Sequence, residues 1–408
     1  MSQTMVHTDS ITAEDPHSEP AKKQKSRRPA NTAFRQQRLK AWQPILTPKT
    51  VLPIFFAVGI IFAPIGGLLL WASATVQELS IDYTQCTSDA TDTFQPIPTS
   101  HVESHFKSSN TTSRAQWRTE NQTVTPLLGV DQPNTPVCTL QFTLPNDIGP
   151  PVYLYYRLTN FYQNHRRYVK SLQLDQLKGQ FVDNSTIAGS ACNPLKTNEN
   201  GVAIYPCGLI ANSIFNDTIN SPTLVSSSGG QTSQNYSMTR QGIAWASDLE
   251  LYGKTAYKNY EVVPPPNWQN RFPDGYTDEN PIPDLSTYEE FAVWMRTAGL
   301  PTFSKLALRN DNDVMVAGTY ELSIYDFFDV KSYGGTKNLL ISTRTVMGGK
   351  NNFLGIAYIV VGGLCIVLGV LFTVAHLIKP RKLGDHTYLS WNNDSAPTAT
   401  TTSRDTGR

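Results

Sequence analysis

The chain has 408 residues, its 34 basic and 33 acidic side chains leave a net charge of +1, and 39% of its residues are hydrophobic. These averages would suit a soluble protein of two or three domains. The distribution of the apolar residues excludes that class, because they are concentrated in two long stretches without Asp, Glu, Lys or Arg. We therefore expect an integral membrane protein, and one without a nucleic-acid partner.

The N-terminal tail, residues 1–50, is predicted to be cytosolic. Its first 28 or so residues are polar and lack hydrophobic periodicity, which indicates disorder. Residues 28–43 differ, because Asn31 or Thr32 can cap a helix that runs to Trp42 and mixes basic with aromatic side chains. Such a helix beside a membrane span is expected to lie in the lipid headgroup layer. A second interpretation, compatible with the first, is that it docks on the cytosolic surface of a partner.

Two segments are predicted to be transmembrane helices, residues 51–71 and residues 353–378. At about 1.5 Å of rise per residue, each is long enough to cross the roughly 30 Å hydrocarbon core of a bilayer. A long polar stretch precedes the first segment, so we interpret it as a signal anchor and not as a cleaved signal peptide.

Flanking charge predicts the orientation of both spans. Six Lys or Arg residues lie from Arg27 to Lys49, whereas none occurs between Trp71 and Lys107. The positive-inside rule then places the N-terminus in the cytosol. The second span returns the chain to the cytosol, so residues 379–408 are predicted to form a disordered cytosolic tail.

Residues 72–352 are consequently predicted to be a lumenal or extracellular ectodomain. Five Asn-x-Ser/Thr sequons fall inside this stretch and are predicted glycosylation sites: Asn110, Asn121, Asn184, Asn216 and Asn235. A sixth sequon, at Asn393, falls in the cytosolic tail and is expected to stay bare.

Four of the five cysteines also lie in the predicted ectodomain: Cys86, Cys138, Cys192 and Cys207. An even number in an oxidising compartment indicates disulfides. Four cysteines allow three pairings, of which the sequential one is the simplest and leaves no crossed loops. Cys365 lies in the second span, where we interpret it as a small apolar residue.

The ectodomain is predicted to be mainly β, with a few helices, giving an α+β domain. Strand candidates rich in β-branched and aromatic residues are 137–144, 152–158, 202–205, 319–325 and 339–346. Residues 287–298 are predicted to form an amphipathic helix that ends before Gly299 and Pro301, and residues 160–174 a basic helix. Most of residues 184–238 are predicted to be exposed glycosylated loop, apart from the stretch around Cys207.

A search for catalytic chemistry yields two weak candidates. His101 and His105 are four residues apart, but Glu103 is misplaced for the zinc-protease pattern. Asp311 and Asp313 resemble the metal-binding carboxylates of lumenal glycosyltransferases, yet such triplets are common in polar turns. We interpret both as coincidental and predict no catalytic residue, no metal site and no cofactor.

Small residues recur along both spans. Gly59, Ala63 and Gly67 repeat every four residues, and Gly355, Gly362 and Gly369 repeat every seven. Both spacings give a helix a smooth face that another helix can approach closely. The two open interpretations are packing of the spans against each other and docking onto a partner. The residues alone thus indicate a glycosylated, two-pass, non-enzymatic protein that binds another membrane protein.

Six stretches resemble the cell-division-cycle-fifty (ligand-effect modulator) family, with order and spacing kept from about residue 28 to residue 380. They are residues 28–37 (RPANTAFRQQ), 156–168 (YRLTNFYQNHRRY), 207–217 (CGLIANSIFND), 242–245 (GIAW), 294–303 (WMRTAGLPTF) and 348–358 (GGKNNFLGIAY). The resemblance implies an accessory β-subunit of a type-four P-type ATPase, which moves phospholipids to the cytosolic leaflet. It also implies the sequential disulfide pairing.

In such a complex the catalytic aspartate, the nucleotide site and the lipid path belong to the α-subunit. The β-subunit is implied to support folding, export and the transport cycle of its partner in membranes of the secretory and endosomal system. We expect the N-terminal segment to contact the pump through Arg28, Asn31, Phe34 and Arg35. The alternative is a two-pass ligand-gated channel or receptor, which would share the topology but not the apolar spans.

Overall fold

The structure is a computed structural model that describes residues 31–40, 46–107, 114–227, 234–343 and 349–380. It separates into two units, residues 1–54 with 369–408 and residues 55–368. Several sequence predictions concern residues outside the described ranges: Arg28, Trp42, Asn110, Asn393 and the tail beyond residue 380.

Residues 31–40 form a single exposed turn and not the predicted helix. The backbone N–H of Gln36 donates to Thr32 O at 2.9 Å, and Gln37 then adopts a left-handed φ of 54° that ends the turn. One isolated turn is unfavourable to extend, because its few hydrogen bonds do not offset the ordering of its residues.

Both predicted spans are confirmed as long apolar helices, α1 (Pro48–Ala74) and α9 (Phe353–Ile378). The helix α1 extends beyond the apolar run of residues 51–71 and begins at Pro48, which fits the first helical position because no N–H is needed there. Thr47 precedes it and accepts the backbone N–H of Thr50 at 3.0 Å. Both helices are long and apolar enough to cross a membrane.

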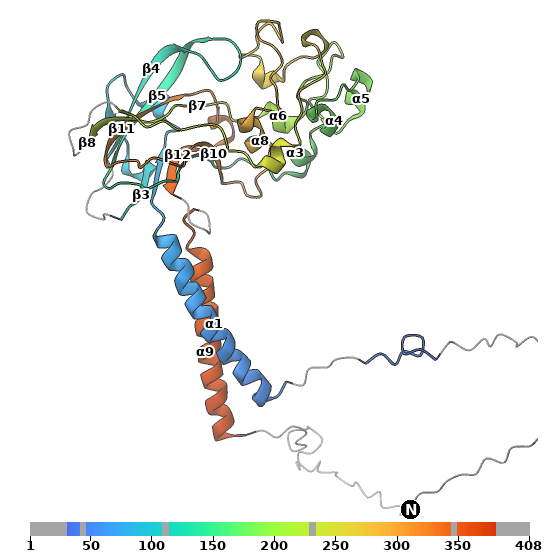
Figure 1. Ribbon diagram of the computed structural model, residues 1–408, viewed down its shortest axis with the longest axis vertical. Coiled ribbons are helices and arrows are strands. Elements are labelled where there is room, and N and C mark those ends of the chain that lie inside the picture. The colour runs from blue at the N-terminus through green and yellow to red at the C-terminus, as the bar shows by residue number, and fades with distance from the viewer. Residues whose placement is uncertain (1–30, 41–45, 108–113, 228–233, 344–348, 381–408) are drawn as a thin grey trace, which may run out of the picture. The chain divides into compact units, whose positions relative to one another are not determined.

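The domain between α1 and α9, which we call the ectodomain after its predicted placement, contains two antiparallel sheets (Figure 1). One sheet has the order β10-β6-β12-β1-β3, with bounds Phe303–Asn310, Val152–Leu158, Lys337–Thr343, Glu78–Asp82 and Val102–His105. The other has the order β2-β4-β5-β11-β8-β9, with bounds Gln95–Pro96, Ala115–Val124, Gln132–Leu144, Gly318–Tyr325, Thr223–Ser227 and Gln234–Asn235. The short β7 (Thr218–Ile219) pairs with β11.

Both sheets bury one face in a common core. Along β11 every second residue is buried, and its inward residues Leu322 and Ile324 join Leu140 of β5 and Leu339 and Ile341 of β12 in one cluster. This period of two follows from the pleat of a strand. Four of the five predicted strands are confirmed, as β5, β6, β11 and β12, whereas the other strands of the two sheets were missed.

Short helices and irregular chain occupy the region between β6 and β10, residues 159–302. Besides the strands β7, β8 and β9 given above, its elements are α3 (Arg166–Lys170), α4 (Leu174–Leu177), α5 (Asn184–Gly189), α6 (Leu209–Asn212), α7 (Ala246–Leu249), η2 (Asn259–Glu261), η3 (Pro266–Trp268) and α8 (Glu289–Met295). Elsewhere lie α2 (Cys86–Asp89), η1 (Thr99–His101) and η4 (Lys331–Tyr333). We call residues 159–302 the irregular region; Figure 1 shows α3, α4, α5, α6 and α8 together on one side of the strands.

Three sequence predictions for the irregular region need correction. The helix predicted over residues 160–174 is reduced to α3, and residues 202–205 form isolated bridges, such as that between Ile204 and Val263, in place of a strand. Much of residues 184–238 is buried, although it was predicted to be exposed loop: Phe215 and Tyr236 are at most 9% exposed. Its abundant Ser, Thr and Asn concealed apolar residues whose partners are distant in sequence.

Two fully buried tryptophans fix α6 inside the ectodomain. Trp294 of α8 donates its indole N–H to Ile210 O at 2.8 Å, and Trp268 of η3 donates to Ala211 O at 3.0 Å. Both bonds satisfy carbonyls at the end of a four-residue helix, which such a helix cannot satisfy by itself. The irregular region is therefore ordered by aromatic side chains where it has few backbone ladders.

Candidate partner-contact sites

The small-residue seam brings α1 and α9 together. A Cβ on Gly59 would lie 3.0 Å from Gly362 O, and a Cβ on Gly362 would lie 3.0 Å from Ala63 N. Closer to the outer ends, a Cβ on Gly355 would lie 3.0 Å from Gly66 O. These residues therefore allow backbone-to-backbone approach of the chain's own two spans, the first of the two interpretations offered by the sequence.

Gly67 does not belong to this seam. It is exposed and has no atom within 4 Å of an added Cβ, whereas Gly66 is buried against Ile359. A strict four-residue repeat drifts by about 80° over eight residues, while residue 66 stays within about 20° of Gly59. The seam of α1 is thus Gly59, Ala63 and Gly66. On α9, Gly369 is buried, as Gly355 and Gly362 are.

A polar link closes the seam at the end of α1 and the start of α9. The buried Ser73 of α1 donates to Asn352 Oδ1 at 2.6 Å and accepts the backbone N–H of Asn351 at 3.0 Å. Further along the two helices, the ring centroids of Phe62 of α1 and Tyr358 of α9 lie 5.0 Å apart. The GGKNNFLGIAY stretch singled out in the sequence therefore contributes to packing between the two helices.

The described part of the N-terminal segment presents its side chains to solvent. Phe34 is 76% exposed, and Arg35 is exposed as well. The Oδ1 atom of Asn31 accepts a hydrogen bond from Arg38. An exposed phenyl ring among guanidinium groups suits a headgroup layer or a partner surface equally, so the contact predicted for these residues stays a prediction.

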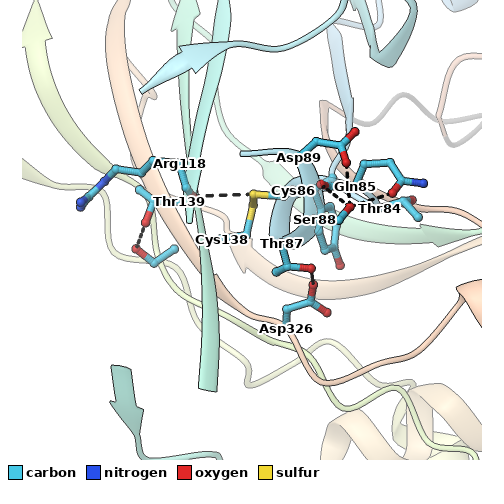
Figure 2. Close-up of a disulfide and its surroundings, with 12 residues drawn as sticks. Thr84, Gln85, Cys86, Thr87, Ser88, Asp89, Arg118, Cys138, Thr139 and Asp326 are labelled. Atoms are coloured by element: carbon cyan, nitrogen blue, oxygen red, sulfur yellow. Dashed lines mark hydrogen bonds between the residues drawn. A yellow bond between two sulfur atoms is a disulfide. The ribbon is translucent and has the colours of Figure 1, made fainter. Parts of the chain in front are cut away.

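Two disulfides staple the ectodomain, with the sequential pairing. Cys86 of α2 bonds Cys138 of β5, with Cα atoms 5.9 Å apart, and Cys192 bonds Cys207, with Cα atoms 5.7 Å apart. Figure 2 shows the first, where α2 lies against β5 and Thr87 donates to Asp326 at 3.1 Å. Cys365 of α9 carries a free thiol.

The described sequon asparagines differ in exposure. Asn121 on β4 and Asn235 on β9 are exposed. Asn184 is exposed too, but its Oδ1 accepts the backbone N–H of Ala203 at 3.0 Å. Asn216 is half-buried, and its Oδ1 is a buried atom without a hydrogen-bond partner. Three of the predicted glycosylation sites are therefore accessible in the folded ectodomain, and Asn216 is the least accessible of those described.

The weak catalytic candidates occupy ordinary structural positions. The ring of His101 packs edge-on against Trp117, and its Nδ1 lies 3.9 Å from Asp82. Asp311 pairs with Arg309 at 2.7 Å. Within the described ranges, no three His, Cys, Asp or Glu side chains are grouped so that they could hold a metal ion.

A buried charge network, missed in the sequence, joins the irregular region to β12. Lys337 is 2% exposed, donates to Asp217 Oδ2 at 2.8 Å and also contacts Asp326. Asp217 accepts further hydrogen bonds from Tyr83 and from the backbone N–H groups of residues 327 and 328. The signal was present in the sequence, because Lys337 shares the inward face of its strand with Leu339 and Ile341.

Two carboxylates share one ammonium in this network. Burial opposes the charge of Lys337, but Asp217 and Asp326 outweigh it and hold the pKa of Lys337 above its ordinary value. Burial, together with the nearby Asp217, raises the pKa of Asp326. The first shift is expected for a cation between two carboxylates, and the second for buried carboxylates that compete for one cation. The network has a structural role, because its charged groups are bonded to one another.

Two of the family-like stretches meet at a groove of about 690 Å³, lined by β6, residues 242–245, α7, the end of α8 and β10. We call it the Trp245 groove. Glu289 of α8 accepts the backbone N–H groups of Gly242 and Ala244 at 2.9 and 3.0 Å, which fixes the loop that carries Trp245. Trp245 itself is 63% exposed.

Lys305 of β10 lies behind this groove and was also missed. Its ammonium donates to three backbone carbonyls at the end of α8, those of Val293, Trp294 and Arg296, at 2.8, 3.0 and 2.6 Å. It thereby caps the C-terminal end of α8, where backbone carbonyls lack partners within the helix and the helix dipole favours a positive charge. Burial, together with the adjacent positive charge of Arg296, lowers the pKa of Lys305 to about 7.

Comparisons with known proteins agree over most of the chain. Residues 69–382 match the model of the LEM3 (ligand-effect modulator 3) family / CDC50 family. The chain is 46% identical to the phospholipid-transporting ATPase accessory subunit CDC50 of Chaetomium thermophilum, over 91% of this chain and 92% of that protein. It is 45% identical to the accessory subunit CRF1 of Saccharomyces cerevisiae, over 92% and 91%.

A more distant relative extends the likeness to animals. Cell cycle control protein 50A of Mus musculus is 40% identical, over 86% of this chain and 89% of that protein. The stretch matched by the family model includes the end of α1, the whole domain between the two helices and all of α9. The chain belongs to the LEM3/CDC50 family.

Proposed function

We propose that this chain is the accessory subunit of a phospholipid-transporting P-type ATPase and forms a heterodimer with its catalytic subunit in a membrane. The observation that carries the proposal is the identity of 45–46%, over about nine-tenths of both chains, to proteins named as such subunits. The two apolar helices and the stapled ectodomain between them are consistent with a membrane-anchored binding partner.

The catalytic steps then belong to the partner, and this chain acts without chemistry of its own. Two buried lysines with shifted pKa values, Lys337 and Lys305, are bonded to groups of the same chain and serve the fold. Its role is to stabilise the ATPase during folding, export and the transport cycle. The seam residues pack α1 against α9, so contacts with the partner's helices fall on the outer faces, where Gly67 lies.

The test is affinity purification of the tagged full-length chain in a mild detergent. We expect a stoichiometric P-type ATPase to co-purify, and the reconstituted pair to move labelled phospholipids in an ATP-dependent way. The chain reconstituted alone is expected to show neither ATP hydrolysis nor lipid transport above empty vesicles. If the chain alone transported lipid and Asp313→Ala abolished that transport, the interpretation as an enzyme would be restored.

The proposed topology places both termini in the cytosol and residues 72–352 outside it. It rests on the flanking charge and on the distribution of sequons and cysteines. Glycosidase treatment should increase gel mobility, and peptide mass spectrometry should find glycans at Asn121, Asn184 and Asn235. We expect the lowest occupancy at the half-buried Asn216. A glycan on Asn393 would contradict the orientation.

A further inference from the structure

The Trp245 groove combines a flat aromatic surface with a pair of polar groups at its edge. The guanidinium of Arg296 lies 5.0 Å from the centre of the Trp245 ring. The same guanidinium forms a bidentate pair with Asp248, with N–O distances of 2.8 and 3.0 Å. Tyr153 and Tyr155, on the same face of β6, add two further rings with centroids 6.1 Å apart.

The cations that line the groove are already neutralised. Arg296 is paired with Asp248, and Arg309 with Asp311 at 2.7 Å. Lys305 donates its ammonium hydrogens to three backbone carbonyls at the end of α8. A phosphate or an acidic peptide would have to compete with these bonds, so the groove favours a ligand without net charge.

A pyranose ring matches this arrangement chemically. Its C–H faces are apolar and stack on an aromatic ring, while its hydroxyl edge needs donors and acceptors side by side. Trp245, with 63% of its surface exposed, offers the aromatic ring, and the Asp248–Arg296 pair offers the acceptors and donors for the hydroxyls. The volume of about 690 Å³ lies in the range of roughly 300–1,000 Å³ that is usual for ligand sites.

We propose that the Trp245 groove binds a neutral oligosaccharide, with one sugar ring stacked on Trp245 and adjacent hydroxyls bonded to Asp248 and Arg296. The site goes beyond the accessory role and rests on the proposed function only through the lumenal or extracellular placement of the ectodomain, where glycans occur. Two walls of the groove are held in position by hydrogen bonds. Lys305 bonds the end of α8, and Glu289 bonds the loop of residues 242–245.

The experiment is a calorimetric titration of the full-length chain in lipid nanodiscs, which avoids detergents that carry sugar headgroups. The chain's own glycans are first trimmed with an endoglycosidase. The probes are neutral oligosaccharides of two to five sugars, based on mannose, glucose and N-acetylglucosamine, with a glutamate-rich peptide and inorganic phosphate for comparison. We expect saturable binding of at least one oligosaccharide, and weaker or absent binding of both anionic probes.

Trp245→Ala should weaken that binding at least about tenfold, and Trp245→Phe should retain part of it. The matched control is Tyr260→Ala, because Tyr260 is 76% exposed and also has a cation, Lys258, 5.9 Å from its ring centre. It lies outside the groove and should leave the affinity unchanged. Equal thermal melting of the three variants shows that the fold is intact.

The proposal is wrong if no oligosaccharide binds saturably, if the anionic probes bind more tightly, or if Trp245→Ala and Tyr260→Ala bind alike. Since the titration contains no ATPase, these outcomes leave the proposed accessory function standing. Conversely, the absence of a co-purifying ATPase would refute the accessory function while a groove that still bound sugar would keep this inference.

Discussion

The helix pair and the ectodomain are held together in different ways. Between α1 and α9 the contacts are close backbone approaches at Gly59, Gly66 and Gly362, with a polar link at Ser73. The ectodomain instead buries charged groups, two disulfides and a cluster of aromatic rings. In a bilayer the surroundings are as apolar as the side chains, so helices associate through the close packing that small residues allow. In the ectodomain, by contrast, a buried charge is stable only beside a specific partner. Single changes should therefore have larger effects in the ectodomain.

The largest effect is expected at the buried charge network. Lys337→Met leaves Asp217 and Asp326 buried without their cation, and breaking a buried pair costs about 3–5 kcal/mol. Denaturation of the purified chain, followed by circular dichroism, measures the loss. Lys331→Met is the control, because Lys331 is exposed, and should change stability by less than about 0.5 kcal/mol. If both variants lost the same free energy of unfolding, the buried network would not be a special source of stability in the ectodomain.

The two disulfides should come next and should differ from each other. In the chain-entropy model, closing the 52-residue separation of Cys86–Cys138 stabilises the fold by about 4 kcal/mol, and closing the 15-residue separation of Cys192–Cys207 by about 3 kcal/mol. Paired Cys→Ser variants, compared for export from the endoplasmic reticulum and for denaturation midpoint, should follow that order. The reverse order would show that the irregular region depends more on its covalent staple than loop length predicts.

A smaller effect is expected at the seam. Gly59→Leu places a side chain where a Cβ already lies 3.0 Å from Gly362 O, and overpacking typically costs about 1–3 kcal/mol. Gly67→Leu is the matched control, because nothing lies within 4 Å of its Cβ.

The readout is oxidative cross-linking between cysteines placed at positions 63 and 362, in a Cys365→Ala background. We expect an efficient internal cross-link in the parent chain, a weak one with Gly59→Leu and an unchanged one with Gly67→Leu. If the cysteine at position 63 instead trapped the ATPase, the seam would be a partner site.

The smallest effect is a pH dependence from Lys305. Its pKa in the folded chain is about 7, below the ordinary 10.5. Below pH 7 both states are protonated and the cost of burying the ammonium is constant. Above pH 7 the unfolded state binds the additional proton, so stability rises with pH, by about 1 kcal/mol between pH 7 and 8. The stability of the parent chain minus that of Lys305→Met should therefore increase by about 1 kcal/mol between pH 7 and 8, measured by denaturation at each pH, and parallel pH profiles would contradict the prediction.

The sequence by itself determined the elements whose signal is local. The two spans are continuous apolar runs longer than a bilayer is thick, and α8 begins at an amphipathic pattern that ends before Gly299 and Pro301. Strands β5, β6, β11 and β12 contain short runs rich in β-branched and aromatic residues, a signal that a few neighbouring residues suffice to reveal. The seam residues were also visible, apart from Gly66, because a spacing of four was followed where the helical period of 3.6 requires seven.

Tertiary structure alone decided what those elements contact. It assigned the seam to packing between α1 and α9, and it buried Lys337 between two carboxylates that lie 120 and 11 residues earlier. It also ordered the irregular region, where Trp294 and Trp268 bond the carbonyls of α6. The reason is physical: periodicity reports which face of an element is apolar, whereas a buried charge or an indole N–H is stabilised by partners distant in sequence, which become neighbours only when the chain folds.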